Sequence, residues 1–135
     1  MKRTLALALL ALSACGKGPD DPRPTMPRHI YTWAWRLVDG THPRPEQAPP
    51  VSCREVGASW VGMAFEPQGT GMPVIPYESP CTPTGRASSD PLPDGRYRIA
   101  AAVLDSKKKI LNSVVFDDEL GDDVEFELLF PLLPL

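Results

Sequence analysis

The stretch 95-GRYRIAAAVLD-105 is the part of the sequence that decides the fold. Its apolar residues recur at every second position, the period of a β-strand with one buried face: Tyr97, Ile99, Ala101 and Val103. Arg96 and Arg98 occupy the opposite face. Residues 105–109 form a polar turn, and the apolar segment 110–116 returns from it. This region therefore predicts a β-hairpin.

Alternating patterns occur on both sides of this hairpin. They predict four further strands, at 31–37, 61–65, 73–78 and 124–130. The strand 73–78 belongs at a sheet edge because it carries Pro73 and Pro76. The 17 prolines fall mainly between such segments, where they fit an all-β domain better than a helical one. The fold class predicted is a small two-layer antiparallel β-sandwich of the all-β, Ig-like kind.

The N-terminus has the features of an export signal. Lys2 and Arg3 precede an apolar run, 5-LALALLAL-12, which is too short to span a bilayer as a permanent helix. The next four residues, 12-LSAC-15, resemble the lipobox of bacterial lipoproteins. That resemblance implies cleavage before Cys15 and attachment of diacylglycerol and fatty acid to it. The alternative is an ordinary secretory signal in which Cys15 is incidental.

The predicted organisation has three parts. A signal peptide occupies residues 1–14, a lipidated cysteine with a proline-rich tether occupies 15–28, and the β-sandwich domain occupies 29–135. Gly16 stands where an acidic residue commonly retains lipoproteins at the inner membrane, so the expected location is the cell envelope, at the outer membrane.

The other two cysteines are predicted to form a disulfide. Export places the chain in an oxidising compartment, and lipidation of Cys15 leaves Cys53 and Cys81 as a pair among three cysteines. Closing that loop is worth about 3 to 4 kcal/mol on the chain-entropy relation. A zinc or nucleophilic role is the rival, but only His29 and His42 could supply further ligands or a base.

A family resemblance supports the same architecture. The segment 92-LPDGRY-97, followed by a strand, a polar turn and a second strand, resembles the LPxGxY hairpin of carboxypeptidase-regulatory-like and transthyretin (prealbumin)-like domains. The resemblance implies a β-sandwich and no particular activity. The sequence departs from the pattern at 106-SKKK-109, where a glycine often makes the turn.

Several segments are candidates for binding. The acidic stretch 117–123 could bind calcium through Asp117, Asp118, Asp122 and Asp123, or form a solvated loop between two strands. Trp60 has the opposite parity from the apolar residues of its strand and is a candidate ligand contact, whereas Tyr31, Trp33 and Trp35 are expected in the core.

Two further segments have competing interpretations. Lys107–Lys109 either touch anionic headgroups or form a soluble tip. The apolar end 128–135 either folds back over the sandwich or docks on a partner, and we expect the fold-back.

The sequence predicts a non-catalytic protein without a cofactor. It contains no GxSxG, HExxH or phosphate-binding glycine loop, and its net charge of −3, made more negative by loss of Lys2 and Arg3, disfavours nucleic acid as a partner. We expect a membrane-anchored structural or interaction module whose partner is an envelope protein or a glycan. The alternative is a carbohydrate- or peptide-binding module that uses exposed aromatics.

Overall fold

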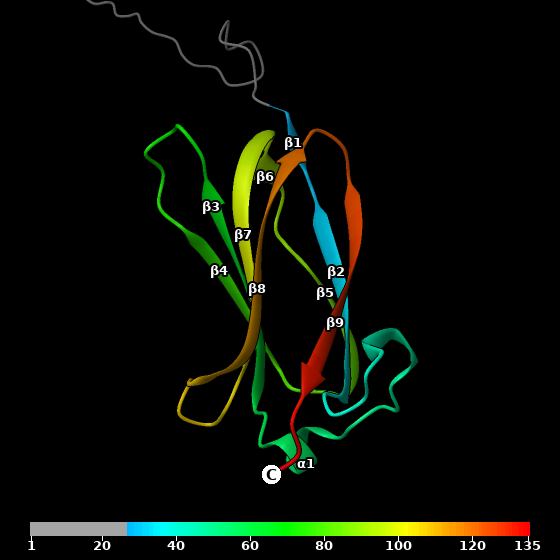
Figure 1. Ribbon diagram of the computed structural model, residues 1–135. Coiled ribbons are helices and arrows are strands. Elements are labelled where there is room, and N and C mark those ends of the chain that lie inside the picture. The colour runs from blue at the N-terminus through cyan, green and yellow to red at the C-terminus, as the bar shows by residue number, and fades with distance from the viewer. Residues whose placement is uncertain (1–26) are drawn as a thin grey trace, which may run out of the picture.

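Two β-sheets face each other in the computed structural model, which describes residues 27–135 (Figure 1). The first sheet has the order β4-β3-β7-β8 and contains β3 (Trp60–Pro67), β4 (Ile75–Pro80), β7 (Gly95–Leu104) and β8 (Ile110–Leu120). The second has the order β5-β2-β9 and contains β2 (Tyr31–Asp39), β5 (Thr84–Ser88) and β9 (Val124–Leu132). The predicted all-β sandwich is confirmed.

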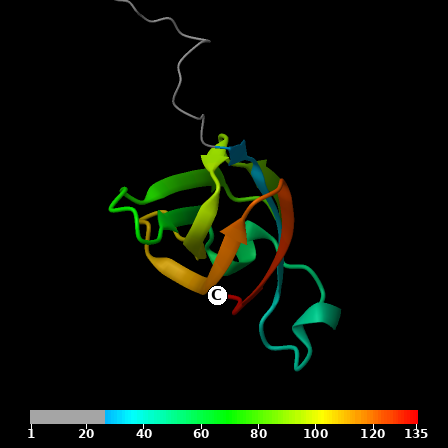
Figure 2. The ribbon, with the colours of Figure 1, turned by 90° about the horizontal axis from the view of Figure 1, so that it is seen from above.

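Short elements complete the architecture. β1 (Arg28–His29) pairs with β6 (Leu92–Pro93) at one end of the sandwich, and a helix, α1 (Cys53–Val56), lies near the other (Figure 1). Seen end-on, the sheets enclose the core, and a segment with a 3-10 turn at Pro45–Gln47 projects away from it (Figure 2).

The outermost strands of the chain meet in the second sheet. β9 runs parallel to β2, with Tyr31 opposite Val124 and Asp39 opposite Leu132, whereas every other pair of strands among residues 27–135 is antiparallel. This pair is an exception to the expected antiparallel pattern. It places the last strand beside the first long one, so the domain is closed by contacts that span almost its entire length.

The core consists of the inward-facing residues that the alternating patterns predicted. Tyr31, Trp33 and Trp35 are buried as expected. The Phe65 ring lies at the centre, with its centroid 5.1 Å from that of Tyr31 and 5.9 Å from that of Trp33. Edge-to-face and tilted aromatic pairs of this kind add about 0.5 to 1.5 kcal/mol each beyond the burial of their area.

The 92–97 motif has a clear structural role. Gly95 has φ of 148°, a backbone conformation that side chains disfavour, and it turns the chain from β6 into β7. Two residues later the buried Tyr97 reaches back, and its hydroxyl donates a hydrogen bond to the carbonyl of Pro93. The motif therefore fixes the start of the long hairpin.

The β7–β8 turn forms without glycine. Lys108 adopts a φ of 65°, and the Asp105 carboxylate accepts hydrogen bonds of 2.8 Å from the backbone N–H groups of Lys107 and Lys109. These bonds stabilise the turn in place of the glycine that the family pattern favours.

Three expectations about element boundaries were wrong. Residues 117–123 do not form one loop, because β8 continues to Leu120 and the turn is confined to residues 121–123. No helix was predicted between the strands 31–37 and 61–65, but α1 lies there. Arg28, placed in the tether, pairs with Pro93 in the β1–β6 ladder.

The C-terminal segment behaves as expected as far as Leu132. Leu128, Phe130 and Leu132 are buried, and the backbone N–H of Leu135 donates to the carbonyl of Glu55 in α1 at 2.9 Å. The expected fold-back is confirmed, although the Leu133 and Leu135 side chains are exposed. The signal peptide 1–14, Cys15 and the tether up to residue 26 lie outside the described residues.

Candidate functional site

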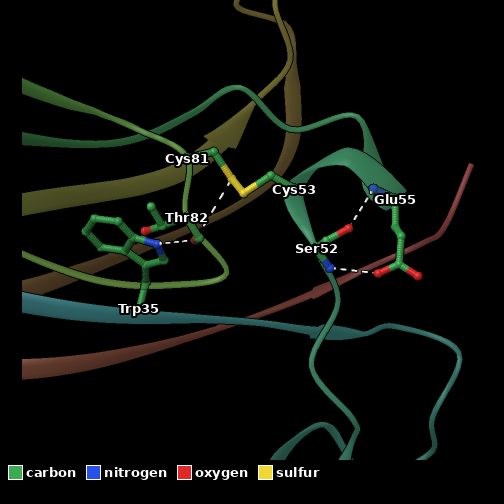
Figure 3. The surroundings of a disulfide bond; sticks show 6 residues. All are labelled: Trp35, Ser52, Cys53, Glu55, Cys81 and Thr82. Carbon is green, nitrogen blue, oxygen red and sulfur yellow. Dashed lines mark hydrogen bonds between the residues drawn. A yellow bond between two sulfur atoms is a disulfide. The ribbon is translucent and has the colours of Figure 1, made fainter.

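The disulfide predicted between Cys53 and Cys81 is present. Its Cα atoms are 6.2 Å apart, and it joins the first residue of α1 to the residue after β4 (Figure 3). The backbone N–H of Cys81 donates to the carbonyl of Ser59 at 2.9 Å, next to β3. The bond therefore ties α1 to the end of the four-stranded sheet.

The helix beside the disulfide is held by a capping box. The Ser52 hydroxyl accepts from the Glu55 N–H at 3.1 Å, and the Glu55 carboxylate accepts from the Ser52 N–H at 2.8 Å (Figure 3). Gly57 ends the helix in the left-handed conformation. Sequence reasoning missed this element, although Ser52 and Glu55 have the spacing that signals it.

Trp35 lies on the opposite side of the Cys53–Cys81 disulfide from α1 (Figure 3). Its indole N–H donates to the carbonyl of Thr82 at 2.9 Å (Figure 3). A Cβ atom placed on Gly85 would lie 2.2 Å from Cζ2 of this ring, so the ring occupies the space above the glycine. Thr82 and Gly85 thus position the chain after Cys81 around a buried tryptophan.

Trp60 is half-buried on the outer face of the four-stranded sheet, where it pairs with Pro80 and Leu104. The ammonium of Lys108 lies 4.6 Å from the centroid of its ring, and the same ammonium is 2.5 Å from a carboxylate oxygen of Glu78. A cation–π contact therefore covers part of the ring that was predicted to meet a ligand.

The four aspartates proposed for calcium are separated by the extension of β8. Asp117 and Asp118 lie on opposite faces of the strand: one is 3.4 Å from Nε of Arg98, and the other accepts a hydrogen bond of 3.2 Å from the Tyr31 hydroxyl. Asp123 accepts the N–H of Ile30 at 2.9 Å. Among residues 27–135 no three acidic, histidine or cysteine side chains form a metal-binding group.

An acidic hollow of about 600 Å³ lies at the end where β1 and β6 pair. Asp94, Glu119 and Asp122 line it. Just beside it, the His29 imidazole Nδ1 is 2.6 Å from Oδ1 of Asp94. This hydrogen bond raises the pKa of His29, and the charges of Asp123 and Asp122 act in the same direction. The pair fixes β1 to the body of the sandwich.

Two other pKa shifts reflect burial in one case and backbone hydrogen bonds in the other. Burial raises the pKa of Tyr31, and the neighbouring Asp118 carboxylate raises it further. The backbone N–H of Lys109, followed by that of Lys107, lowers the pKa of Asp105 against the opposing effect of desolvation. These groups stabilise the sheet and the turn described above.

A second hollow, of about 350 Å³, lies on the outer face of the three-stranded sheet and was not predicted. The small side chain of Ala34 forms part of its wall, with Arg36 and Thr84 on one side and Glu127 and Leu129 on the other. Nearby, Arg86 and Glu125 form an exposed ion pair of 2.6 Å. The hollow presents opposite charges around an apolar base, an arrangement suited to a polar ligand or peptide.

No protein-family model matches the chain, and no curated protein and no solved structure is significantly similar to it. The resemblance of residues 92–97 to the LPxGxY hairpin thus stays an expectation. Over the described part of the chain, no helix has both the length and the apolar character required to cross a membrane.

Proposed function

We propose that the chain is a lipid-anchored protein of the bacterial cell envelope, whose β-sandwich acts as a non-catalytic structural or interaction module. The observation that carries the proposal is 12-LSAC-15 directly after a short apolar run. The disulfide between Cys53 and Cys81 supports it, since such bonds persist in exported proteins.

The attachment of β1 to the sandwich also supports an N-terminal anchor. The Asp94 N–H donates to the carbonyl of Pro27 at 3.0 Å, and the Arg28 guanidinium donates to the carbonyl of Pro91 at 3.1 Å. His29 pairs with Asp94, as described above. A tether that ends at Pro27 would therefore join the domain at the end where β1 and β6 pair, and not on either broad face of the sandwich.

The alternative, a carbohydrate- or peptide-binding module using exposed aromatics, has less support. Tyr31, Trp33 and Trp35 are buried, and Lys108 covers part of Trp60. The hollow around Asp94 has no aromatic residue in its lining, and the hollow around Ala34 has only the buried Trp35.

The decisive experiment is the intact mass of the protein purified from detergent-solubilised membranes, beside a Cys15→Ala variant. We expect a chain that begins at Cys15 and carries the mass of diacylglycerol and a further acyl group, absent from the variant. An unmodified chain, or one cleaved elsewhere, would refute the anchor. Alkylation before and after reduction provides the internal control, because Cys53 and Cys81 should react only after reduction.

A further inference from the structure

β8 is an edge strand of the four-stranded sheet, and near its start the Asn112 side chain donates to the carbonyl of Pro131 in β9 at 2.6 Å. β8 lies at the end of the order β4-β3-β7-β8, and none of the strands among residues 27–135 pairs with its other side. The edge strands β4 and β9 contain prolines, and β5 has only 5 residues, whereas β8 has 11 residues and no proline. Proline and short length are two of the devices that keep sheet edges from pairing, and β8 lacks both.

The backbone groups that face this free edge can be assigned. The N–H groups of Ser113 and Glu119 donate to the side chains of their preceding residues, Asn112 and Asp118, at 2.7 and 2.8 Å. In a strand the N–H and C=O groups of one residue point to the same side and alternate along the chain. Beyond the register shift at residues 110–112, the N–H and C=O groups that point away from β7 are therefore those of the odd-numbered residues from 113 to 119, with Val115 near the middle.

The centre of this edge is apolar and exposed. The Val115 side chain, on the outer face of the sheet, is 60% exposed, and that of Val114, on the inner face, is 41% exposed. Phe116 is half-buried against Phe126, with ring centroids 4.8 Å apart. A strand laid along β8 would cover Val114 and Val115.

The charges along β8 select the strand that would lie there. The turn at its start carries Lys107–Lys109, whereas its second half and the following turn carry acidic residues: Asp117, Asp118, Glu119, Asp122 and Asp123. Two copies in parallel would set the acidic halves against each other, which is destabilising. Two antiparallel copies would set the basic turn of each against the acidic end of the other.

The antiparallel register follows from the length and parity of the strand. Full overlap of residues 110–120 of two copies places Val115 against Val115 of the second copy, and Val114 against its Phe116. The odd-numbered backbone groups then face each other, as pairing requires. Asp117 meets Ser113 of the second copy, and Lys107 meets its Asp123.

We propose that the protein forms a two-fold symmetric dimer through antiparallel pairing of the β8 edges, which joins the two four-stranded sheets into one continuous sheet with Val115 on the axis. The inference goes beyond the proposed function and does not depend on the lipid at Cys15. Such an interface is isologous, since the same edge is used by both copies.

A single cysteine on the axis tests the register. Directly opposed residues of a hydrogen-bonded antiparallel pair have Cα atoms about 5.5 Å apart, within the range of about 4.4 to 6.8 Å that a disulfide spans. Val115→Cys should therefore link two copies. Ser113→Cys is the matched control, two residues away on the same face, because the two Ser113 positions are about 14 Å apart in this register at about 3.4 Å per residue.

The full chain is expressed with its own leader, extracted in mild detergent, oxidised, alkylated and resolved without reductant. We expect V115C as a covalent species of twice the chain mass, and S113C as the single chain. A V115C sample that stays a single chain, an equal cross-link in S113C, or a link from V115C to a different protein would overturn the proposal. The unmutated chain treated in the same way shows whether Cys15 itself forms a link, so the gel separates the Val115 linkage from the state of Cys15.

Non-covalent association gives a second, independent readout. Sedimentation in detergent should show the unmutated chain and Val115→Thr as dimers. Val115→Lys sets two like charges against each other and should raise the dissociation constant of the dimer by about tenfold or more. An unmutated chain that sediments as a monomer throughout the micromolar range would refute the dimer. A cooperative melting transition, followed by fluorescence of the buried Trp33 and Trp35, shows that each variant is folded.

Discussion

Removal of the disulfide should lower the stability of the domain by an amount that can be calculated from the length of its loop. Cys53 and Cys81 are separated by 28 residues. The chain-entropy relation for a loop of that length gives about 12 cal/mol/K, or about 3.6 kcal/mol at 25 °C. A domain of about 109 residues has an unfolding entropy of about 0.23 kcal/mol/K near 60 °C, so Tm should fall by about 16 °C.

The variant for this measurement is the double replacement Cys53→Ala and Cys81→Ala, which leaves no unpaired thiol. Thermal and urea unfolding are followed by tryptophan fluorescence, which reports on the buried Trp33 and Trp35. The urea m-value should rise, because the open chain exposes more surface when it unfolds. The matched control is the unmutated protein under reductant, which should melt with the variant. A decrease in Tm of less than about 5 °C, or an unchanged m-value, would refute the argument that the bond acts on the unfolded chain.

Two other substitutions test contacts elsewhere in the sandwich. Gly85→Ala forces a methyl group against the Trp35 ring and should cost about 1 to 3 kcal/mol of unfolding free energy in a urea titration; Gly121→Ala, with no atom within 4 Å of the added Cβ, should change it little, and equal effects would contradict the packing argument. Asp94→Asn should lower the pKa of His29 measured by NMR titration, because the Asp94 hydrogen bond raises it. Because the pKa of His29 is raised in the folded protein, the pair stabilises the fold fully at pH values below the unfolded pKa of histidine, and this stabilisation is lost as pH rises through the folded pKa. The difference in unfolding free energy between the unmutated protein and Asp94→Asn should therefore shrink with rising pH. A constant difference would argue against the ion pair.

The strands could be predicted from sequence because their pattern is local. Alternation of apolar residues identifies β7 from Tyr97 to Val103 whatever its neighbours are. The pairing of β2 with β9 leaves no such trace, since a parallel ladder between distant segments depends on how the whole chain closes. α1 was a different case: Ser52 and Glu55 have the spacing of a capping box, but the helix is only 4 residues long and follows a proline-rich segment that is typical of a loop.

The candidate sites could be predicted less well, for a related reason. The parity of Trp60 placed it on the outer face of its strand, but only the β7–β8 turn brings Lys108 over its ring. The hollow around Ala34 arises where three strands place small and long side chains side by side. The aspartates of 117–123 were separated because Asp117 and Asp118 joined a strand, which sends successive side chains to opposite faces.

The anchor and the dimer constrain each other. β1 lies at the Leu120 end of β8, where Ile30 bonds Asp123, so an antiparallel pair places its two Pro27 residues about one strand length apart (Figure 1). Eleven residues of strand span about 36 Å at about 3.3 Å each. The twelve residues between Cys15 and Arg28 would span about 37 Å as a polyproline chain at about 3.1 Å each. Both lipids can lie in one bilayer, because a two-fold axis perpendicular to the membrane holds the two Pro27 residues at the same height. Deleting six residues between Cys15 and Arg28 should therefore preserve the V115C cross-link, since neither tether has to run along the domain, and loss of the cross-link would contradict this arrangement.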